Sequence, residues 1–166
     1  MNRSVRILPL ACAIALAACS GPKGNSPDVE PTGTPAAAAP ETKPGLSLSG
    51  GKLVLPAVSG NPAAAYFTLV NGSPKPVTVA AVDVAGAGMA MLHETKDMGG
   101  HASMAEMAGP ELKPGETLTL ARGGKHVMID GVPASWKPGG TAELTLTFAD
   151  GDKLSAPLAI EAPGGE

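Results

Sequence analysis

The sequence predicts an all-β domain, an antiparallel β-sandwich or Greek-key barrel of roughly seven to eight strands. Short alternating or β-rich segments recur at 52–56, 64–71, 77–84, 89–95, 117–121, 126–129, 141–149 and 153–160. Breaks that contain glycine, most of them with proline, asparagine or aspartate, separate many of these segments, and no sustained helical stripe appears beyond the N-terminal region. Many short strands with regularly spaced turns are typical of sandwiches and barrels.

The clearest hairpin lies near the C-terminus. Leu144, Leu146 and Phe148 alternate with polar residues and therefore share one face of a strand. Asp150-Gly151 follows, and this dipeptide suits the positive φ angles of a two-residue type I′ turn. Earlier in the chain, residues 99–107 have room for a short helical turn.

The N-terminal segment indicates export from the cytoplasm. Two arginines within the first six residues precede an apolar run at 7–18, which is typical of a secretory signal. The run is too short to span a membrane, because a transmembrane helix needs roughly 20 apolar residues. The sequence ending at Cys19 resembles the lipobox of bacterial lipoproteins, which implies that residues 1–18 are removed and Cys19 is lipidated. Ser20, in place of Asp, implies the outer membrane in a Gram-negative cell. The alternative is that Cys19 is merely a small residue of the signal.

Residues 19–50 are expected to form a disordered tether. They are rich in Pro, Ala, Gly, Ser and Thr and cannot bury enough apolar surface to offset the entropy of ordering. Some 30 residues at about 3.3 Å each reach on the order of 100 Å when extended. Residues 51–162 have the length of one domain, and residues 163–166 form a flexible tail.

Composition excludes several classes of function. The chain has two cysteines, Cys12 and Cys19, both at the N-terminus, so the folded domain has no disulfide and no thiolate ligand or nucleophile. The formal net charge is -3 and no Lys/Arg cluster occurs, which argues against nucleic-acid binding. A G-x-S-x-G elbow and a Ser–His pairing in a triad-like setting are also missing. We therefore predict a protein that is not an enzyme.

Histidine and methionine gather in one window of the sequence. The three histidines, and every methionine of the seven except the initiator, fall between residues 89 and 128. Methionine alone would indicate core packing, but packing does not draw all the histidines into the same window. Metal ligation explains both. The members are His93, His101, His126, Met89, Met91, Met98, Met104, Met107 and Met128.

The spacing of these residues predicts a shared site. His126 and Met128 are two apart on a strand, so their side chains point the same way at a spacing of about 7 Å. Met91 and His93 repeat this spacing, and His93 faces the same locus if the two strands are neighbours. Imidazole and thioether ligands favour copper(I) over zinc, calcium or magnesium. Thioethers also resist the oxidising cell envelope, where exposed thiols are lost.

These residues resemble the signature of a known family. His93, ten intervening residues, Met104, twenty-one intervening residues and then His126-x-Met128 is similar to the H-x10-M-x21-H-x-M motif of PCu(A)C-type periplasmic copper(I) chaperones. The resemblance extends over 64–71, 93–95, 112–116 and 144–148, which is nearly the whole folded domain. One departure is Arg122 before Gly-Gly, where the family usually has proline.

The resemblance implies a cupredoxin-like β-sandwich that binds copper(I) through His93, Met104, His126 and Met128. It also implies a periplasmic metallochaperone that delivers copper to a cuproenzyme such as cytochrome oxidase subunit II and that receives it from another copper donor protein. The membrane is contacted only through the lipid. Copper buffering or resistance, and a structural lipid-tethered module, stay open as alternatives. Met98 and His101 are either accessory metal contacts or part of a solvated loop.

Overall fold

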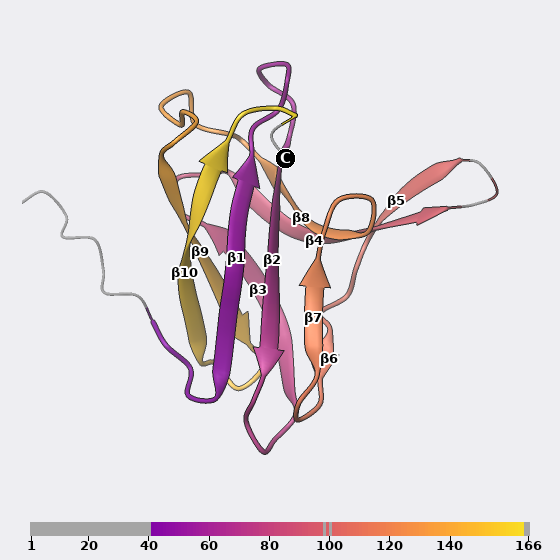
Figure 1. The fold of residues 1–166 in the computed structure, drawn as a ribbon, viewed down its shortest axis with the longest axis vertical. Helices are drawn as coiled ribbons and strands as arrows, with labels where there is room; N and C mark the ends of the chain where they lie inside the picture. The colour runs from indigo at the N-terminus through magenta and orange to yellow at the C-terminus, as the bar shows by residue number, and fades with distance from the viewer. Residues whose placement is uncertain (1–40, 98, 100, 165–166) are drawn as a thin grey trace, which may run out of the picture. The chain divides into compact units, whose positions relative to one another are not determined.

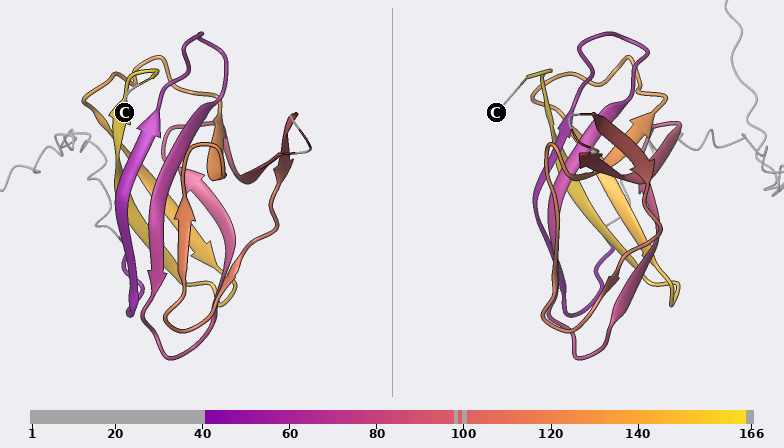
Figure 2. Two further views of the ribbon diagram at one scale, coloured as in Figure 1. Left: turned by 45° about the vertical axis from the view of Figure 1, so that its right-hand side comes forward. Right: turned by 90° about the vertical axis from the view of Figure 1, so that its right-hand side faces the viewer.

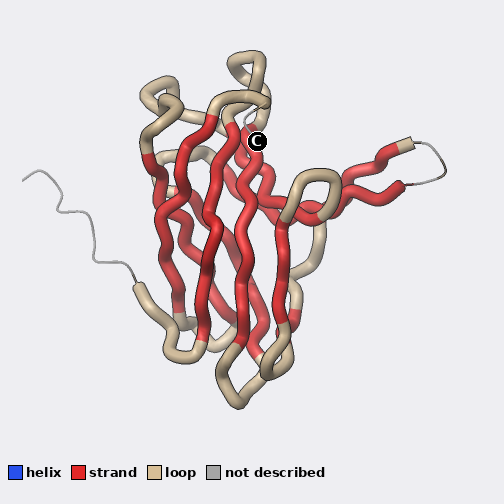
Figure 3. The backbone as a smooth tube through the Cα atoms, viewed as in Figure 1, coloured by secondary structure: helices blue, strands red, loops and turns tan. Residues whose placement is uncertain are grey.

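The computed structural model of this chain describes residues 41–97, 99 and 101–164, which form strands and turns (Figure 3). The expected all-β class is confirmed, with ten strands in the described part where seven to eight were expected. None of the described residues forms a helix long and apolar enough to cross a membrane. The strands are β1 (Leu46–Val54), β2 (Ala63–Asn71), β3 (Val77–Val84), β4 (Met89–Asp97), β5 (Ala102–Glu106), β6 (Glu111–Leu112), β7 (Thr117–Leu120), β8 (Lys125–Asp130), β9 (Thr141–Phe148) and β10 (Lys153–Glu161).

The strands join in one long, curled sheet. Its order is β5-β4-β8-β2-β1-β10-β9-β3-β6, and β7 pairs with a different stretch of β2 than β8 does. The β1–β10 pair is parallel, and the other described pairs are antiparallel. β3 and β4 lie near opposite ends of this order and nevertheless contact each other, because the sheet wraps around a common interior (Figures 1 and 2).

Alternation along the strands separates a buried face from an outer face. In β2 every second residue is buried, starting with Ala63 and including Phe67 and Leu69. β9 buries Leu144 and Leu146 in the same way. Each large apolar side chain removed from water contributes roughly 1.5–3 kcal/mol, so this interior face stabilises the fold. The residues between them face outward, where side chains are free to serve a function.

The β9–β10 hairpin has a different turn from the one expected. The amide of Gly151 donates to the carbonyl oxygen of Phe148 (2.9 Å), and Gly151 has a φ of 88°. The amide of Phe148 in turn donates to the carbonyl of Asp152 (2.9 Å), which leaves three residues in the loop. A three-residue loop that ends on a left-handed glycine replaces the two-residue type I′ turn.

Two strands were missed by the sequence patterns. Residues 102–106 form β5 and not a helical turn, because each of them pairs with the extended β4 strand, from Asp97↔Ala102 to His93↔Glu106. The two-residue β6 pairs with β3. The β4–β5 hairpin extends away from the rest of the sheet (Figure 1). Local sequence is a weak guide to such strands, since their pairing partners decide their conformation.

The folded domain begins before residue 51, within the region expected to be a tether. β1 starts at Leu46 and pairs with the end of β2, where Leu46 lies opposite Asn71. A bulge between Ser49 and Lys52 interrupts the alternation, which is why the sequence pattern did not extend the strand to its true start. Gly51 is required there, because a Cβ atom would lie 2.8 Å from the carbonyl oxygen of Pro157. The expected signal 1–18, Cys19 and the tether up to residue 40 lie outside the described residues.

Lys43 fastens the segment before β1 to the β9–β10 turn. Its ammonium group is buried, with 9% exposure, and forms ion pairs with Asp150 and, at 2.7 Å, with Asp152. It also lies 5.2 Å from the centroid of the Phe148 ring. Burial alone would lower the pKa of Lys43, but the hydrogen bonds and charges of the two carboxylates outweigh burial and raise that pKa. The hydrogen bond from Lys43 lowers the pKa of Asp150.

Lys43→Met is expected to lower the urea midpoint of unfolding at neutral pH, because it keeps the apolar stem and removes the ion pairs. A carboxylate whose pKa is lowered by folding stabilises the folded state above its unfolded pKa of about 3.9, and this contribution is lost as pH falls through the lowered value. The difference in urea midpoint between the variant and the wild type should therefore become smaller as the pH falls toward about 2. Lys52→Met is the control, since Lys52 pairs with Glu161 at 3.1 Å and is 45% exposed. Equal midpoints for the two variants at neutral pH would contradict this role of Lys43.

Candidate metal-binding site

The β4–β8 pair brings the predicted residues to one face of the sheet. The two strands are antiparallel, with His93 opposite His126 and Met91 opposite Met128. Directly opposed residues of neighbouring strands point to the same side. Val127, between His126 and Met128, is completely buried and faces the interior. The His and Met side chains therefore lie on the outer face, backed by the core.

His126 is held in a defined orientation. Its side chain is buried, with 8% exposure, and its Nδ1 lies 3.1 Å from the carbonyl oxygen of Gly124. A carbonyl only accepts, so Nδ1 donates its proton in this contact and Nε2 keeps its lone pair. A histidine that ligates a metal usually donates its second ring nitrogen to such an acceptor. His126 is thus prepared to bind a metal through Nε2.

His93 carries an unsatisfied ring nitrogen. Its Nδ1 is the one buried side-chain nitrogen or oxygen without a hydrogen-bond partner among the described residues. Leaving such an atom unpaired costs roughly 1–3 kcal/mol. The ring lies edge-on to His126, with centroids 6.0 Å apart and planes at 63°. An ion bound between the two rings would give the unpaired nitrogen a partner.

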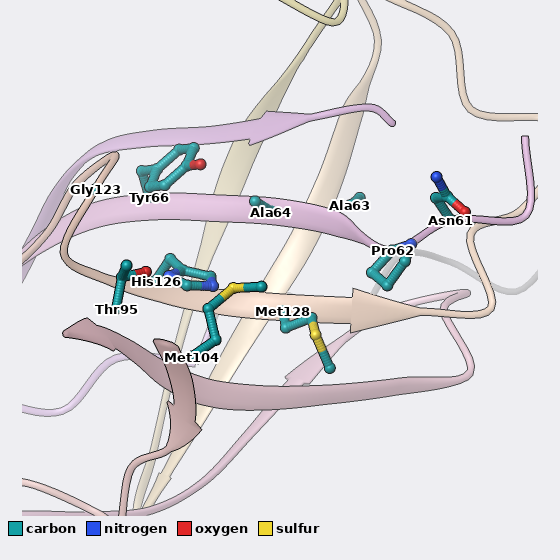
Figure 4. Close-up of a pocket in the computed structure, with 10 residues that line it drawn as sticks. All are labelled: Asn61, Pro62, Ala63, Ala64, Tyr66, Thr95, Met104, Gly123, His126 and Met128. Atoms are coloured by element: carbon teal, nitrogen blue, oxygen red, sulfur yellow. The ribbon is translucent and has the colours of Figure 1, made fainter. Parts of the chain in front are cut away.

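Met104 reaches the site from the projecting hairpin. It lies on β5 opposite Thr95, which is two residues beyond His93 on β4. Its side chain is 64% exposed, yet Figure 4 shows the thioether directed toward the His126 ring, with Met128 further along β8. The hollow at this place has a volume of about 430 Å³. It is lined by Asn61, Pro62, Ala63, Ala64, Tyr66, Thr95, Met104, Gly123, His126 and Met128 (Figure 4).

Of the two accessory residues expected nearby, the structure describes His101, which lies away from the histidine pair. Ala102 pairs with Asp97 and Glu106 with His93, so the exposed His101 lies near the tip of the hairpin and His93 at its base. The length of strand between them is about 14 Å, four residues at roughly 3.4 Å each. Met107 is half-buried and packs against the core. Met98 lies outside the described residues.

The surroundings of the site supply few hard ligands. In the part of the chain that the structure describes, no three His, Cys, Asp or Glu side chains are grouped so as to hold a metal ion. The exposed Glu106 lies opposite His93, and Glu94 forms an ion pair with Lys96 at 3.2 Å. A metal at the outer face of β4 and β8 would therefore depend on thioether as well as imidazole ligands. Soft monovalent copper is the ion that suits such a set.

Sequence reasoning missed the groups that support the ligands. The acceptor for His126 is a backbone carbonyl in the Arg122-Gly123-Gly124 turn, which the sequence indicated only as a break between strands. Gly123 has a φ of 76°, so a glycine is favoured at this bend. The wall of the hollow includes Ala64, which pairs with Met128, and Tyr66 further along β2. A small residue opposite Met128 leaves space beside the thioether, a signal visible only once the register is known.

Comparisons with known proteins identify the group to which the chain belongs. Residues 46–160 match the model of a family described as LpqE-like putative lipoproteins. The chain is 36% identical over 90 residues to the putative lipoprotein Lxx21020 of Leifsonia xyli subsp. xyli (strain CTCB07), which covers 54% of this chain and 52% of that protein. The chain thus spans about half the length of this curated relative.

Solved structures show the same fold. The copper-bound PCuAC domain from PmoF2 has a TM-score of 0.62 and 23% identity, and the match covers 75% of this chain and 99% of that domain. The apo PCuAC domain from PmoF1 has a TM-score of 0.60 and 28% identity, with 72% and 95% covered. The copper(I) form of DR1885 from Deinococcus radiodurans has a TM-score of 0.54 and 31% identity, with 76% and 81% covered.

The fold and the His/Met face together define a domain of the PCuAC class, so the predicted resemblance and the cupredoxin-like architecture are confirmed. Within that class, the chain belongs to the LpqE-like lipoprotein family. The names of both the family and the curated relative support a lipoprotein of the cell envelope.

The orientation of His126 leads to a prediction for the metal-free protein. Long-range ¹H–¹⁵N NMR at slightly alkaline pH should find the proton of neutral His126 on Nδ1, because Gly124 accepts it there. The exposed His101 is the internal reference. A spectrum in which His126 carries its proton on Nε2 would contradict the proposed orientation.

Proposed function

We propose that this protein is a copper(I)-binding metallochaperone of the bacterial cell envelope, and that His93, Met104, His126 and Met128 hold the ion. The observation that carries the proposal is the opposed His93–His126 pair on the outer face, with thioethers on either side of it. Copper-bound and copper(I) forms are known for the structural relatives PmoF2 and DR1885. The unpaired Nδ1 of His93 supports a bound ion at this place.

The exposure of the ligands favours transfer over permanent storage. Met104 is 64% exposed on the hairpin, whereas His126 is 8% exposed and anchored by Gly124. An acceptor ligand can therefore approach where Met104 is, and one copper–sulfur bond breaks as a bond to the acceptor forms. Thioether and imidazole are neutral, so the exchange moves copper(I) without a change of oxidation state or a proton. His126 is the last ligand to leave.

The location and partners follow from the same proposal. Cys19 would be lipidated and residues 19–40 would tether the domain to its membrane, the outer membrane in a Gram-negative cell. This placement puts the domain in the periplasm, where cuproenzymes acquire copper. The acceptor is a cuproenzyme such as cytochrome oxidase subunit II, and another copper protein supplies the ion. The protein itself is a carrier and not an enzyme.

Substitution of single ligands tests the site. We expect His126→Ala and Met128→Ala each to weaken copper(I) binding by at least about tenfold. Removal of a group that merely supports a metal ligand already costs about 10- to 100-fold in affinity. The fold should persist, because both side chains point away from the core. Competition titration against a copper(I) chelator measures the affinity, and His101→Ala is the control. Unchanged affinity in the His126 and Met128 variants would refute the assignment.

Deletion of the gene separates delivery from buffering. A strain without this protein should lose cytochrome oxidase activity when copper is scarce and regain it when copper is added. The exposed Met104 motivates this expectation, since a storage site gains nothing from an open ligand. Copper sensitivity with normal oxidase activity would instead support the buffering or resistance alternative. The assay should include complementation with the His126→Ala variant, which should not restore oxidase activity.

A further inference from the structure

The outer face of the β4–β8 pair carries two thioethers that the proposed ligand set does not use, Met91 next to the histidine pair and Met89 further along β4. Met91 lies opposite Met128 and two residues before His93, and its side chain is half-buried. The face therefore contains two opposed rows, one of histidines and one of methionines. Met104 lies opposite Thr95, on the other side of the histidine row. The histidine pair is thus flanked by thioethers on both sides.

The dimensions of an antiparallel pair allow the two rows to share one ion. Directly opposed Cβ atoms are about 5 Å apart, and side chains two residues apart on a strand are separated by about 7 Å. Methionine has three rotatable bonds and a terminal thioether, so its sulfur can move over distances of this size. Met91 and Met104 approach the histidine pair from opposite directions along β4.

We propose that Met91 is an exchange ligand that replaces Met104 when copper is handed on; this inference rests on the copper(I) function proposed above. The ion then has two overlapping positions, which share His93 and His126. In the exchange, the copper bond to the Met104 sulfur breaks and a bond to the Met91 sulfur forms. Both sulfurs are neutral, so copper stays monovalent and no proton moves. The ion stays coordinated while the hairpin side of the site opens to an acceptor.

The packing of Met91 supports this role over ordinary core filling. Leu92, its neighbour in sequence, is buried in the core, whereas Met91 lies on the opposite face of β4. Met107 packs against the core and shows the ordinary use of methionine in this domain. Met91 also borders a hollow of about 260 Å³ beside Glu106 and Met107, so its side chain is not tightly enclosed.

Met89 provides a matched control. It lies two residues before Met91 on the same strand and is 57% exposed. It is opposite Asp130, which is not one of the proposed ligands. A Leu substitution at either position removes the sulfur and keeps a similar volume. The two positions therefore differ mainly in their distance from the histidine pair.

A double-mutant cycle on the full chain tests the exchange. Copper(I) competition titrations compare wild type, Met91→Leu, Met104→Leu and the double variant, with Met89→Leu and Met89→Leu/Met104→Leu as controls. We expect Met91→Leu alone to change Kd less than about threefold and Met104→Leu to weaken binding about tenfold. The double variant should weaken binding at least about tenfold beyond the product of the single effects. The Met89 double variant should match Met104→Leu alone.

NMR of ¹³C-methyl methionine supplies a readout that a packing effect would not move. In Met104→Leu, copper(I) should shift the Met91 methyl signal and leave the Met89 signal in place. Effects of Met91 and Met104 that simply multiply, together with an unmoved Met91 signal, would overturn the exchange proposal. Wild type that binds no copper(I) would refute the proposed function itself, so the two failures are distinguishable.

Discussion

The register between β4 and β8 is the constraint on which the site depends. Side chains alternate along a strand, so a slip of one residue would move His126 into the interior and bring Val127 to the surface. Val127 and Ile129 are completely buried, and together they hold β8 in its register. The free energy that fixes the site thus comes from apolar contacts on the far side of the sheet. The outer face is therefore not needed to set the register, and its exposed side chain Met104 is free to respond to an ion.

The proposed ligands differ in how firmly the fold holds them. His126 is enclosed and hydrogen-bonded to a backbone carbonyl, and His93 lies on a strand that is paired on both sides. Met104 belongs to β5, which among the described strands pairs with β4 alone. Two-stranded ribbons are marginally stable by themselves, so a hairpin of this kind is able to move without disturbing the core. Histidines held in fixed positions, together with a methionine that can move, suit an ion that must be retained and then released.

Period-2 spacing made part of this site predictable. His126 and Met128 had to share a face once their segment was a strand, and the same reasoning placed Met91 with His93. Which strands are neighbours is a property of tertiary structure, so the direct pairing of His93 with His126 became visible only in the fold. The same limit applies to residues 102–106, whose strand exists because β4 is its partner. It also applies to β1, where the Gly50-Gly51 bulge hides the alternation of the first residues.

In the proposed copper site, the position of Met104 relative to the histidine pair would let one small face both hold and release the ion. If all the thioethers were on the β4–β8 pair, the site would be rigid, and an acceptor would have to compete for every ligand at once. Placing one thioether on a separate hairpin divides that competition into steps, each of which loses a single weak bond. The histidines remain fixed through the first step because the core fixes their strands. In this proposal the first step of release requires movement of β5 alone, and the folded domain would stay intact when the copper leaves.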